Sequence, residues 1–204
     1  MTARRRMNPD ERRRQLLDVG ARLFAAGPYP DVRMEDVAEQ AGISRALLYR
    51  YFPNKTALFA AIFQEASDRL LAKTRIDPAG SLVEQLSAGL DLHFDYFAAN
   101  RNTVLAANRV LAGDPVIQAI INDELAELSR RVLDATGLEG AARKAVFATL
   151  TSWLVFVRAL CVEWLDGEPF TRAELHAMSV GALRGALGAV TDVDRLLGDG
   201  DGHG

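Results

Sequence analysis

The chain has 204 residues, 49% of them hydrophobic, which suits one domain or two small ones with a real core and argues against global disorder. A single cysteine, Cys161, precludes an internal disulfide and a cysteine-based zinc site, so a reducing cytoplasm is the expected compartment. The net charge is −3, but residues 1–58 carry +4 and the remainder −7. That asymmetry suits a polyanion-binding end on an acidic body.

No targeting or membrane segment is expected. The basic start "MTARRRMNPDERRR" is not followed by an apolar stretch, so it does not fit a secretory signal. The most apolar run, residues 150–165, contains Arg158 and Glu163 and is shorter than a bilayer span. Helical periodicity recurs along the whole chain, which predicts an all-α protein of about nine helices.

The first helix is predicted to begin at Pro9. Asn8 is placed to cap it, Pro9 occupies the first turn, where its missing N–H costs nothing, and Glu11 stands at the capping-box position. An apolar face follows, and Gly27-Pro28 ends the helix.

Two short helices, 34–41 and 44–52, are separated by a turn at Gly42. Ser44 is expected to cap the second, and Leu48 and Phe52 to face the core. Helix, glycine turn and helix form the plan of a helix-turn-helix, whose second helix enters the major groove of DNA. The expected outer face is rich in arginine and tyrosine, as a surface that meets a polyanion would be.

Residues 9–63, with "LLDVGARLFAAG" and "MEDVAEQAGISRALLYRYFPNKTALFAAIF", resemble the DNA-binding domain of the tetracycline-repressor (TetR) family. The resemblance implies that Tyr49 and Lys55 contact phosphates. Arg33 and Leu47 depart from the family pattern, in which Thr or Ser is usual at both positions. The full expected DNA-binding set is Arg33, Ser44, Arg45, Ala46, Leu47, Tyr49, Arg50, Tyr51 and Lys55.

A fourth helix is expected to reach about Lys73, followed by a linker at 75–81. Breaks at Gly and Pro then divide the second half into five helices, roughly 81–100, 101–112, 115–136, 139–166 and 171–190. The expected domains are residues 1–58 for DNA binding and 59–197 for ligand binding and dimerisation. Residues 198–204 are expected to form a disordered tail.

Aromatic residues recur at helical spacing in the second half, and the simplest interpretation is a core. The family resemblance implies, in addition, a cavity for an inducer between the fifth and eighth helices. Arg158 needs a partner in such an apolar helix, and a pairing with Glu163 or across a dimer seam remains open. The expected ligand-binding residues are His93, Tyr96, Phe97, Asn108, Phe147, Trp153, Phe156 and Arg158.

The last two helices resemble the dimerisation elements of the family. Gly181, Gly185 and Gly188 in the last helix would allow a close approach between subunits. The sequence therefore predicts a homodimeric regulator, a repressor that binds an operator in double-stranded DNA and is released by a small, largely hydrophobic inducer.

Two alternatives from other classes are weaker. An α-helical small-molecule-binding protein or enzyme with an incidental helix-turn-helix would need a catalytic constellation, yet His93, His176 and His203 are widely scattered. An architectural DNA-binding protein would not need so large an apolar body. We expect no catalytic residues, no metal site and no cofactor, and the sequence leaves activation open beside repression.

Overall fold

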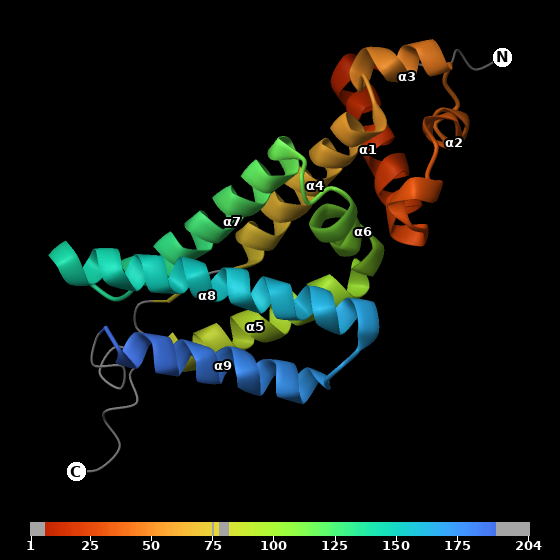
Figure 1. The fold of residues 1–204 in the computed structure, drawn as a ribbon. Coiled ribbons are helices and arrows are strands. Elements are labelled where there is room, and N and C mark those ends of the chain that lie inside the picture. Colours follow the sequence, from red (N-terminus) through yellow and green to blue (C-terminus); the bar gives the residue numbers. More distant parts are fainter. Residues whose placement is uncertain (1–6, 75, 78–81, 191–204) are drawn as a thin grey trace. The chain divides into compact units, whose positions relative to one another are not determined.

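The computed structural model describes residues 7–74, 76–77 and 82–190. The expected tail at 198–204 and most of the expected linker at 75–81 lie outside this range. Every regular element within it is helical, so the all-α prediction is confirmed (Figure 1). The elements are α1 (Pro9–Ala26), a 3-10 turn (Tyr29–Asp31), α2 (Met34–Gln40), α3 (Arg45–Tyr51), α4 (Lys55–Lys73), α5 (Leu82–Ala99), α6 (Arg101–Leu105), a π-helical turn (Ala106–Val110), α7 (Pro115–Asp134), α8 (Gly140–Gly167) and α9 (Arg172–Gly188).

The chain forms two compact units. Of the described residues, the first unit contains 7–66 and 102–117, and the second contains 67–74, 76–77, 82–101 and 118–190. Helices α4 and α7 each begin in the first unit and continue in the second.

The first unit is stabilised by a capping box at the start of α1 and by an aromatic core. Asn8 accepts a hydrogen bond from the Glu11 backbone and Glu11 accepts one from the Asn8 backbone, which is the predicted capping box. Phe24 and Tyr29 stack, and both rings meet Phe59 of α4 edge-on. These contacts hold α1 and the α1–α2 loop against α4.

The helix-turn-helix has the predicted geometry. Gly42 adopts φ +64°, a conformation that costs glycine little, and this lets α2 turn sharply into α3. The Ser44 side chain accepts a hydrogen bond from the Leu47 backbone and caps α3. Leu48 and Phe52 are buried, as expected.

The segment predicted as one helix, 101–112, is divided in the structure. Helix α6 ends at Leu105, and a wider turn follows in which the Leu111 N–H donates to the Ala106 carbonyl, five residues back. The Asn108 side chain donates to the Val104 carbonyl, the group that its own backbone N–H would use in an α-helix. The Asn108 side chain thus competes with its own backbone N–H for the Val104 carbonyl, which is consistent with the change from an α-helix to a wider π-helical turn. The spacing of apolar residues in the sequence does not reveal such a change.

The second unit is built around α5, α8 and α9, each of which contacts the other two. Thr171 and Glu174 form a capping box at the start of α9. Among unbroken helices of the described residues, α8 alone is long and apolar enough to cross a membrane, a criterion that core helices also meet. At 28 residues it is longer than the apolar run in the sequence, so length does not exclude a span. Instead, Trp153, Arg158 and Cys161 of α8 are buried within the protein.

Candidate DNA interface and ligand cavity

Helix α3 presents a polar and aromatic face to solvent. Arg45, Ala46, Tyr49 and Arg50 are exposed, while Leu47 and Tyr51 are half-buried. Tyr49 is 39% exposed, which is high for a large aromatic side chain. The capping bond uses the Ser44 hydroxyl oxygen as an acceptor, which leaves the hydroxyl hydrogen free to donate to a phosphate.

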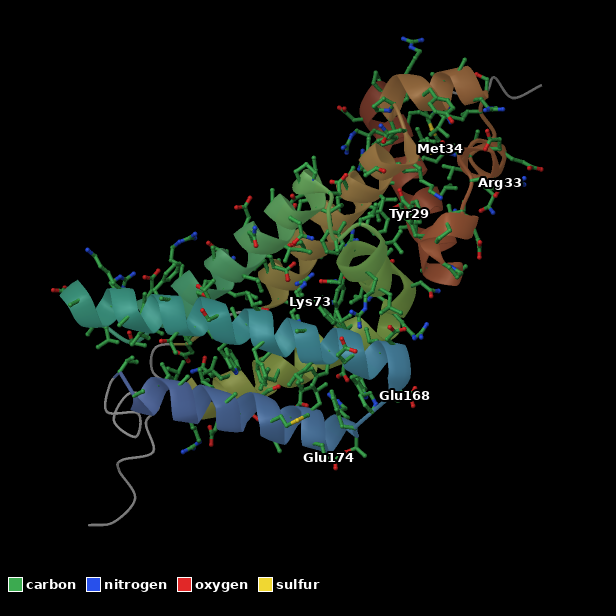
Figure 2. The ribbon with its side chains drawn as sticks, in the orientation of Figure 1. Tyr29, Arg33, Met34, Lys73, Glu168 and Glu174 are labelled. Atoms are coloured by element: carbon green, nitrogen blue, oxygen red, sulfur yellow. The ribbon has the colours of Figure 1, made fainter. Side chains whose placement is uncertain are left out.

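Two arginines of the expected DNA-binding set are held by acidic residues of α2. Arg45 pairs with Glu35, with 2.6 Å between Nη2 and Oε1. Arg33 makes two hydrogen bonds to the Asp36 carboxylate, which hold the pKa of Asp36 below its usual range. Arg33, labelled at the start of α2 in Figure 2, gives that helix no side-chain cap, as its departure from the family pattern suggested. These exposed pairs would exchange readily for DNA phosphates, because surface ion pairs contribute little.

Lys55 has a different environment from the one expected. Its Nζ donates to the carbonyl oxygens of Tyr29, Pro30 and Val32 at 2.7, 3.2 and 2.9 Å. The ammonium also lies 4.3 Å from the centre of the Tyr29 ring. An ammonium has three N–H donors, so these carbonyls can occupy all of them. Contact between Lys55 and a phosphate remains a prediction, and the geometry gives Lys55 a second role in fixing the α1–α2 loop.

The second unit contains an apolar cavity of about 240 Å³. The end of α4 and one side each of α5, α7 and α8 form its wall, with leucine and valine as the main residue types. Of the eight expected ligand residues, His93 and Trp153 line it. The other six do not belong to its wall: Tyr96, Phe97, Asn108, Phe147, Phe156 and Arg158. Phe156 lies on the outer surface, in a shallow groove between α8 and α9.

Five polar side chains line the cavity, and three have hydrogen bonds within the protein. The Gln85 amide bonds both the N–H and the carbonyl of Asp77. The Thr74 hydroxyl donates to the Leu70 carbonyl, and the Ser129 hydroxyl donates to the Leu125 carbonyl. The remaining two are His93 and Lys73, and neither makes a hydrogen bond to another described residue.

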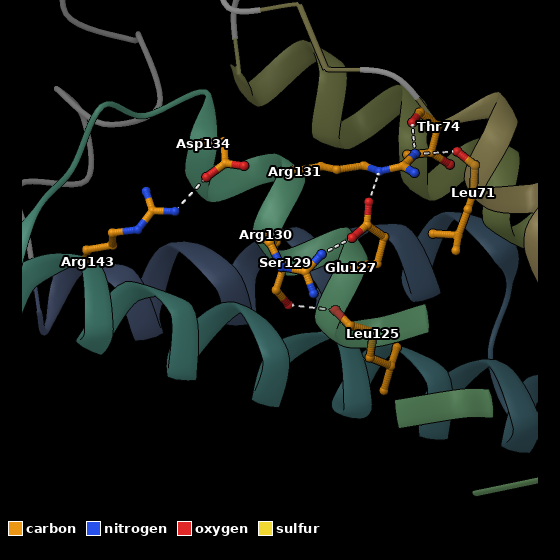
Figure 3. A network of polar contacts seen from close by, with 9 residues as sticks. All are labelled: Leu71, Thr74, Leu125, Glu127, Ser129, Arg130, Arg131, Asp134 and Arg143. Atoms are coloured by element: carbon orange, nitrogen blue, oxygen red, sulfur yellow. Dashed lines mark hydrogen bonds and ion pairs between the residues drawn. The ribbon is translucent and has the colours of Figure 1, made fainter. Parts of the chain in front are cut away.

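Charged side chains reinforce one end of this wall. Arg131 of α7 donates to the carbonyls of Leu71 and Thr74 at the end of α4, and its Nε bonds Glu127 at 2.7 Å (Figure 3). Asp134, the last residue of α7, forms an ion pair with Arg143 of α8 (Figure 3). The bonds to the last carbonyls of α4 fix the segment that carries Lys73 and Thr74.

His93 of α5 is half-buried, with part of its ring on the cavity wall. Its ring packs on Phe97 at a centroid distance of 4.0 Å. Burial, and then the nearby Arg158 guanidinium, lower the pKa of His93 to about 3. The imidazole is therefore neutral at physiological pH and offers one donor and one acceptor.

Arg158 is buried, but it is not a cavity residue. It pairs with Glu124 of α7 at 3.2 Å, and its guanidinium lies 5.3 Å from the Phe97 ring centre. One partner of Arg158 is thus within the chain and on α7, a pairing that the sequence did not suggest. Sequence reasoning also missed Lys73, Thr74, Gln85 and Ser129, because their approach depends on how α4, α5 and α7 pack.

Comparison with known proteins matches both parts of the chain. Residues 16–62 match the family described as "Bacterial regulatory proteins, tetR family". FasR, a transcriptional activator of Mycolicibacterium smegmatis, is 31% identical over 93 residues, which cover 45% of this chain and 42% of FasR. KstR, a repressor of the same organism, is 39% identical over 64 residues, 31% of either chain. The alignments thus span less than half of these relatives.

The fold match is more extensive than the sequence match. A TetR-family transcriptional regulator from Streptomyces coelicolor superimposes with a TM-score of 0.79 and 27% identity, covering 95% of this chain and 91% of that one. The family-model match includes the helix-turn-helix, and the fold match includes the helical body. Together they show that residues 16–62 match the TetR family of bacterial regulatory proteins and that the chain has the fold of a TetR-family regulator.

Proposed function

We propose that the protein is a ligand-responsive transcriptional regulator that binds operator DNA as a homodimer. The observation that carries the proposal is the outer face of α3, where Tyr49 and Arg50 are exposed beside the capped helix start at Ser44. A recognition helix needs such a face, since phosphate contacts position it and base contacts give it specificity. We further propose that the protein acts in the cytoplasm, as a repressor and not as an enzyme.

The outer surface of α8 and α9 supports the dimer. Val155, Phe156 and Met178 are 51%, 41% and 37% exposed, although they are large and apolar. A side-chain carbon added at Gly181 or Gly185 would meet no atom within 4 Å. A second subunit on this surface would cover the apolar side chains and approach closely at the glycines. Two recognition helices could then occupy half-sites about one helical turn of DNA apart.

The cavity supports regulation by a small molecule. Its wall is mostly apolar with few polar groups, which is the usual composition of a ligand site. Ligand binding would favour one of two arrangements of the dimer and so release DNA, as a population shift. Repression is the simpler proposal, although FasR is an activator and KstR a repressor.

DNA binding can be tested without knowing the operator. Selection from a random oligonucleotide pool should enrich a palindromic site, and fluorescence anisotropy should then give its affinity. Tyr49→Ala with Arg50→Ala should weaken binding at least tenfold, because we expect both side chains to contact DNA phosphates. Loss of the Arg50 charge should also reduce the salt dependence of binding. Lys144→Ala, on the exposed surface of α8, is the matched control and should change nothing. A pool without enrichment, or a double variant with full affinity, would contradict the proposal.

A further inference from the structure

The chemistry of the cavity wall restricts the ligand it can hold. No aspartate or glutamate among the described residues lines it, and Thr74, Gln85 and Ser129 already have hydrogen bonds within the protein. The Trp153 indole N–H donates to the Ser179 carbonyl at 2.7 Å, so the ring presents carbon to the cavity. Within the part of the wall that the structure describes, the polar groups that remain for a ligand are the His93 imidazole and the Lys73 ammonium.

These two groups lie at opposite ends of the cavity. The wall contributed by α5 runs from Gln85 to His93, eight residues that span about 12 Å of helix. Gln85 is bonded to Asp77, which follows Lys73 by four residues, so the end of α4 lies at the Gln85 end. Lys73 is exposed there, at the last residue of α4 (Figure 2). His93 is at the inner end, beside Phe97.

The two ends favour different chemical groups. Lys73 offers a positive charge in contact with water, where a carboxylate can bind without losing its hydration. A carboxylate at the inner end would lose that hydration among apolar side chains. The imidazole there is neutral and suits a hydroxyl or carbonyl group, and a bare hydrocarbon would leave its polar atoms unpaired.

The volume sets the size of the ligand. A dry apolar cavity of about 150 Å³ accommodates benzene. The 240 Å³ of this cavity therefore accommodates roughly ten non-hydrogen atoms on the same scale.

We propose that the cavity takes a medium-chain carboxylate whose charged end lies at Lys73 and whose far end carries a hydroxyl or carbonyl group that hydrogen-bonds His93. This inference rests on the proposed function, in which the cavity holds the regulatory ligand. It makes His93 the group that discriminates between ligands, and Lys73 the group that orients them.

Direct binding to the full-length protein tests the assignment with three ten-carbon probes: 10-hydroxydecanoate, decanoate and 1-decanol. Trp153 on the cavity wall allows binding to be followed by fluorescence, with calorimetry as a second readout. The wild type should bind 10-hydroxydecanoate about tenfold more tightly than decanoate, the usual effect of one buried hydrogen bond. Equal affinity for the two acids would overturn the role of His93.

Variants separate the two ends. His93→Leu should abolish the preference for the hydroxy acid, and His93→Gln, which retains a donor and an acceptor, should keep part of it. Lys73→Gln should weaken both acids by up to about fivefold at low salt and leave 1-decanol unchanged. Lys144→Gln is the matched control for charge. If Lys73→Gln binds the acids as Lys144→Gln does, the proposed orientation is wrong.

Failure of the proposed ligand class and failure of the proposed regulatory function give different outcomes in these experiments. A protein that binds its selected DNA but none of the three probes would overturn this ligand class and leave the regulator intact. A protein that binds the hydroxy acid in the predicted order but selects no DNA would support the assignment and overturn the regulator.

Discussion

The polar side chains that are buried among the described residues of the second unit have hydrogen-bond or ion-pair partners, whereas His93 is half-buried on the cavity wall. Arg158 and Glu124 neutralise each other in the core, and Trp153 donates to the Ser179 carbonyl. His93 has no hydrogen bond to another described residue, and it remains neutral because a charge there would be desolvated and would face Arg158. Because the folded chain keeps this imidazole neutral, the free energy of unfolding should depend on pH.

His93 should make stability fall in acid. The imidazole of the unfolded chain takes up its proton near pH 6.5, whereas that of the folded chain does so only near pH 3. Between these values the unfolded state binds more protons, so the free energy of unfolding falls as pH drops below about 6.5 and is unaffected above it. The contribution of His93 to the slope of the free energy of unfolding against pH approaches about 1.4 kcal/mol per pH unit. Urea denaturation of wild type and His93→Gln from pH 4 to 8 measures it, and identical slopes would contradict the prediction.

Lys55 should contribute to stability through the α1–α2 loop. Lys55→Met keeps an apolar stem but leaves the carbonyls of Tyr29, Pro30 and Val32 without this donor. We expect a loss of about 1–3 kcal/mol in the free energy of unfolding, the usual effect of removing a charged donor from partly buried acceptors. Thermal denaturation checks the loss. The salt dependence of DNA binding separates the two roles, because loss of a phosphate contact would lower its slope by about one unit. A stable variant with a lowered slope would assign Lys55 to the phosphate alone.

At the scale of elements, capping residues and glycines decide where helices begin and how closely they approach. Ser44 starts α3 and Gly42 allows the turn before it, and both signals are local in the sequence. Gly20 of α1 has a role that is not local. A side-chain carbon there would lie 2.8 Å from Ile62 Cδ1 and 3.3 Å from Leu58 Cδ2, both on α4. Gly20 thus allows α1 to pack tightly on α4.

Gly20→Val should separate α1 from α4. The added side chain must displace Ile62 and Leu58, and overpacking of this kind costs typically about 1–3 kcal/mol. DNA affinity should also fall, because α1 supports the core on which α3 rests. Chemical denaturation gives the stability, and Gly27→Val, at a position with nothing within 4 Å, is the control for substituting glycine. Equal effects of the two changes would mean that packing against α4 is not the cause.

At the scale of the molecule, the outer surface of α8 and α9 should determine assembly. A side chain at Gly185 would point into open space within one subunit, so Gly185→Leu should leave the fold of the subunit unchanged. Across a dimer seam the same side chain would push the helices apart. We expect monomers by analytical ultracentrifugation, an unaltered circular dichroism spectrum, and a large loss of DNA affinity because the second half-site is lost. An intact dimer would place the seam elsewhere.

The sequence by itself determined most of the helices and the helix-turn-helix of this protein. Asn8 and Ser44 cap the helices they were predicted to cap, and Gly42 makes the turn, because these signals act within a few residues. The exposed face of α3 could likewise be predicted from the buried Leu48 and Phe52, since helical spacing fixes which side chains lie opposite each other.

The tertiary structure alone decided which side chains meet across helices. The pairing of Arg158 with Glu124, the bonds of Lys55 to the α1–α2 loop, and the approach of Lys73 to the cavity wall each join residues of different elements. The family resemblance implied a cavity lined by His93, Trp153 and Phe156 alike; the first two line the cavity of the second unit, and Phe156 lies on the outer surface. The reason is physical: periodicity identifies an apolar face of a helix, and a long helix such as α8 has one apolar face toward the cavity and another toward the surface.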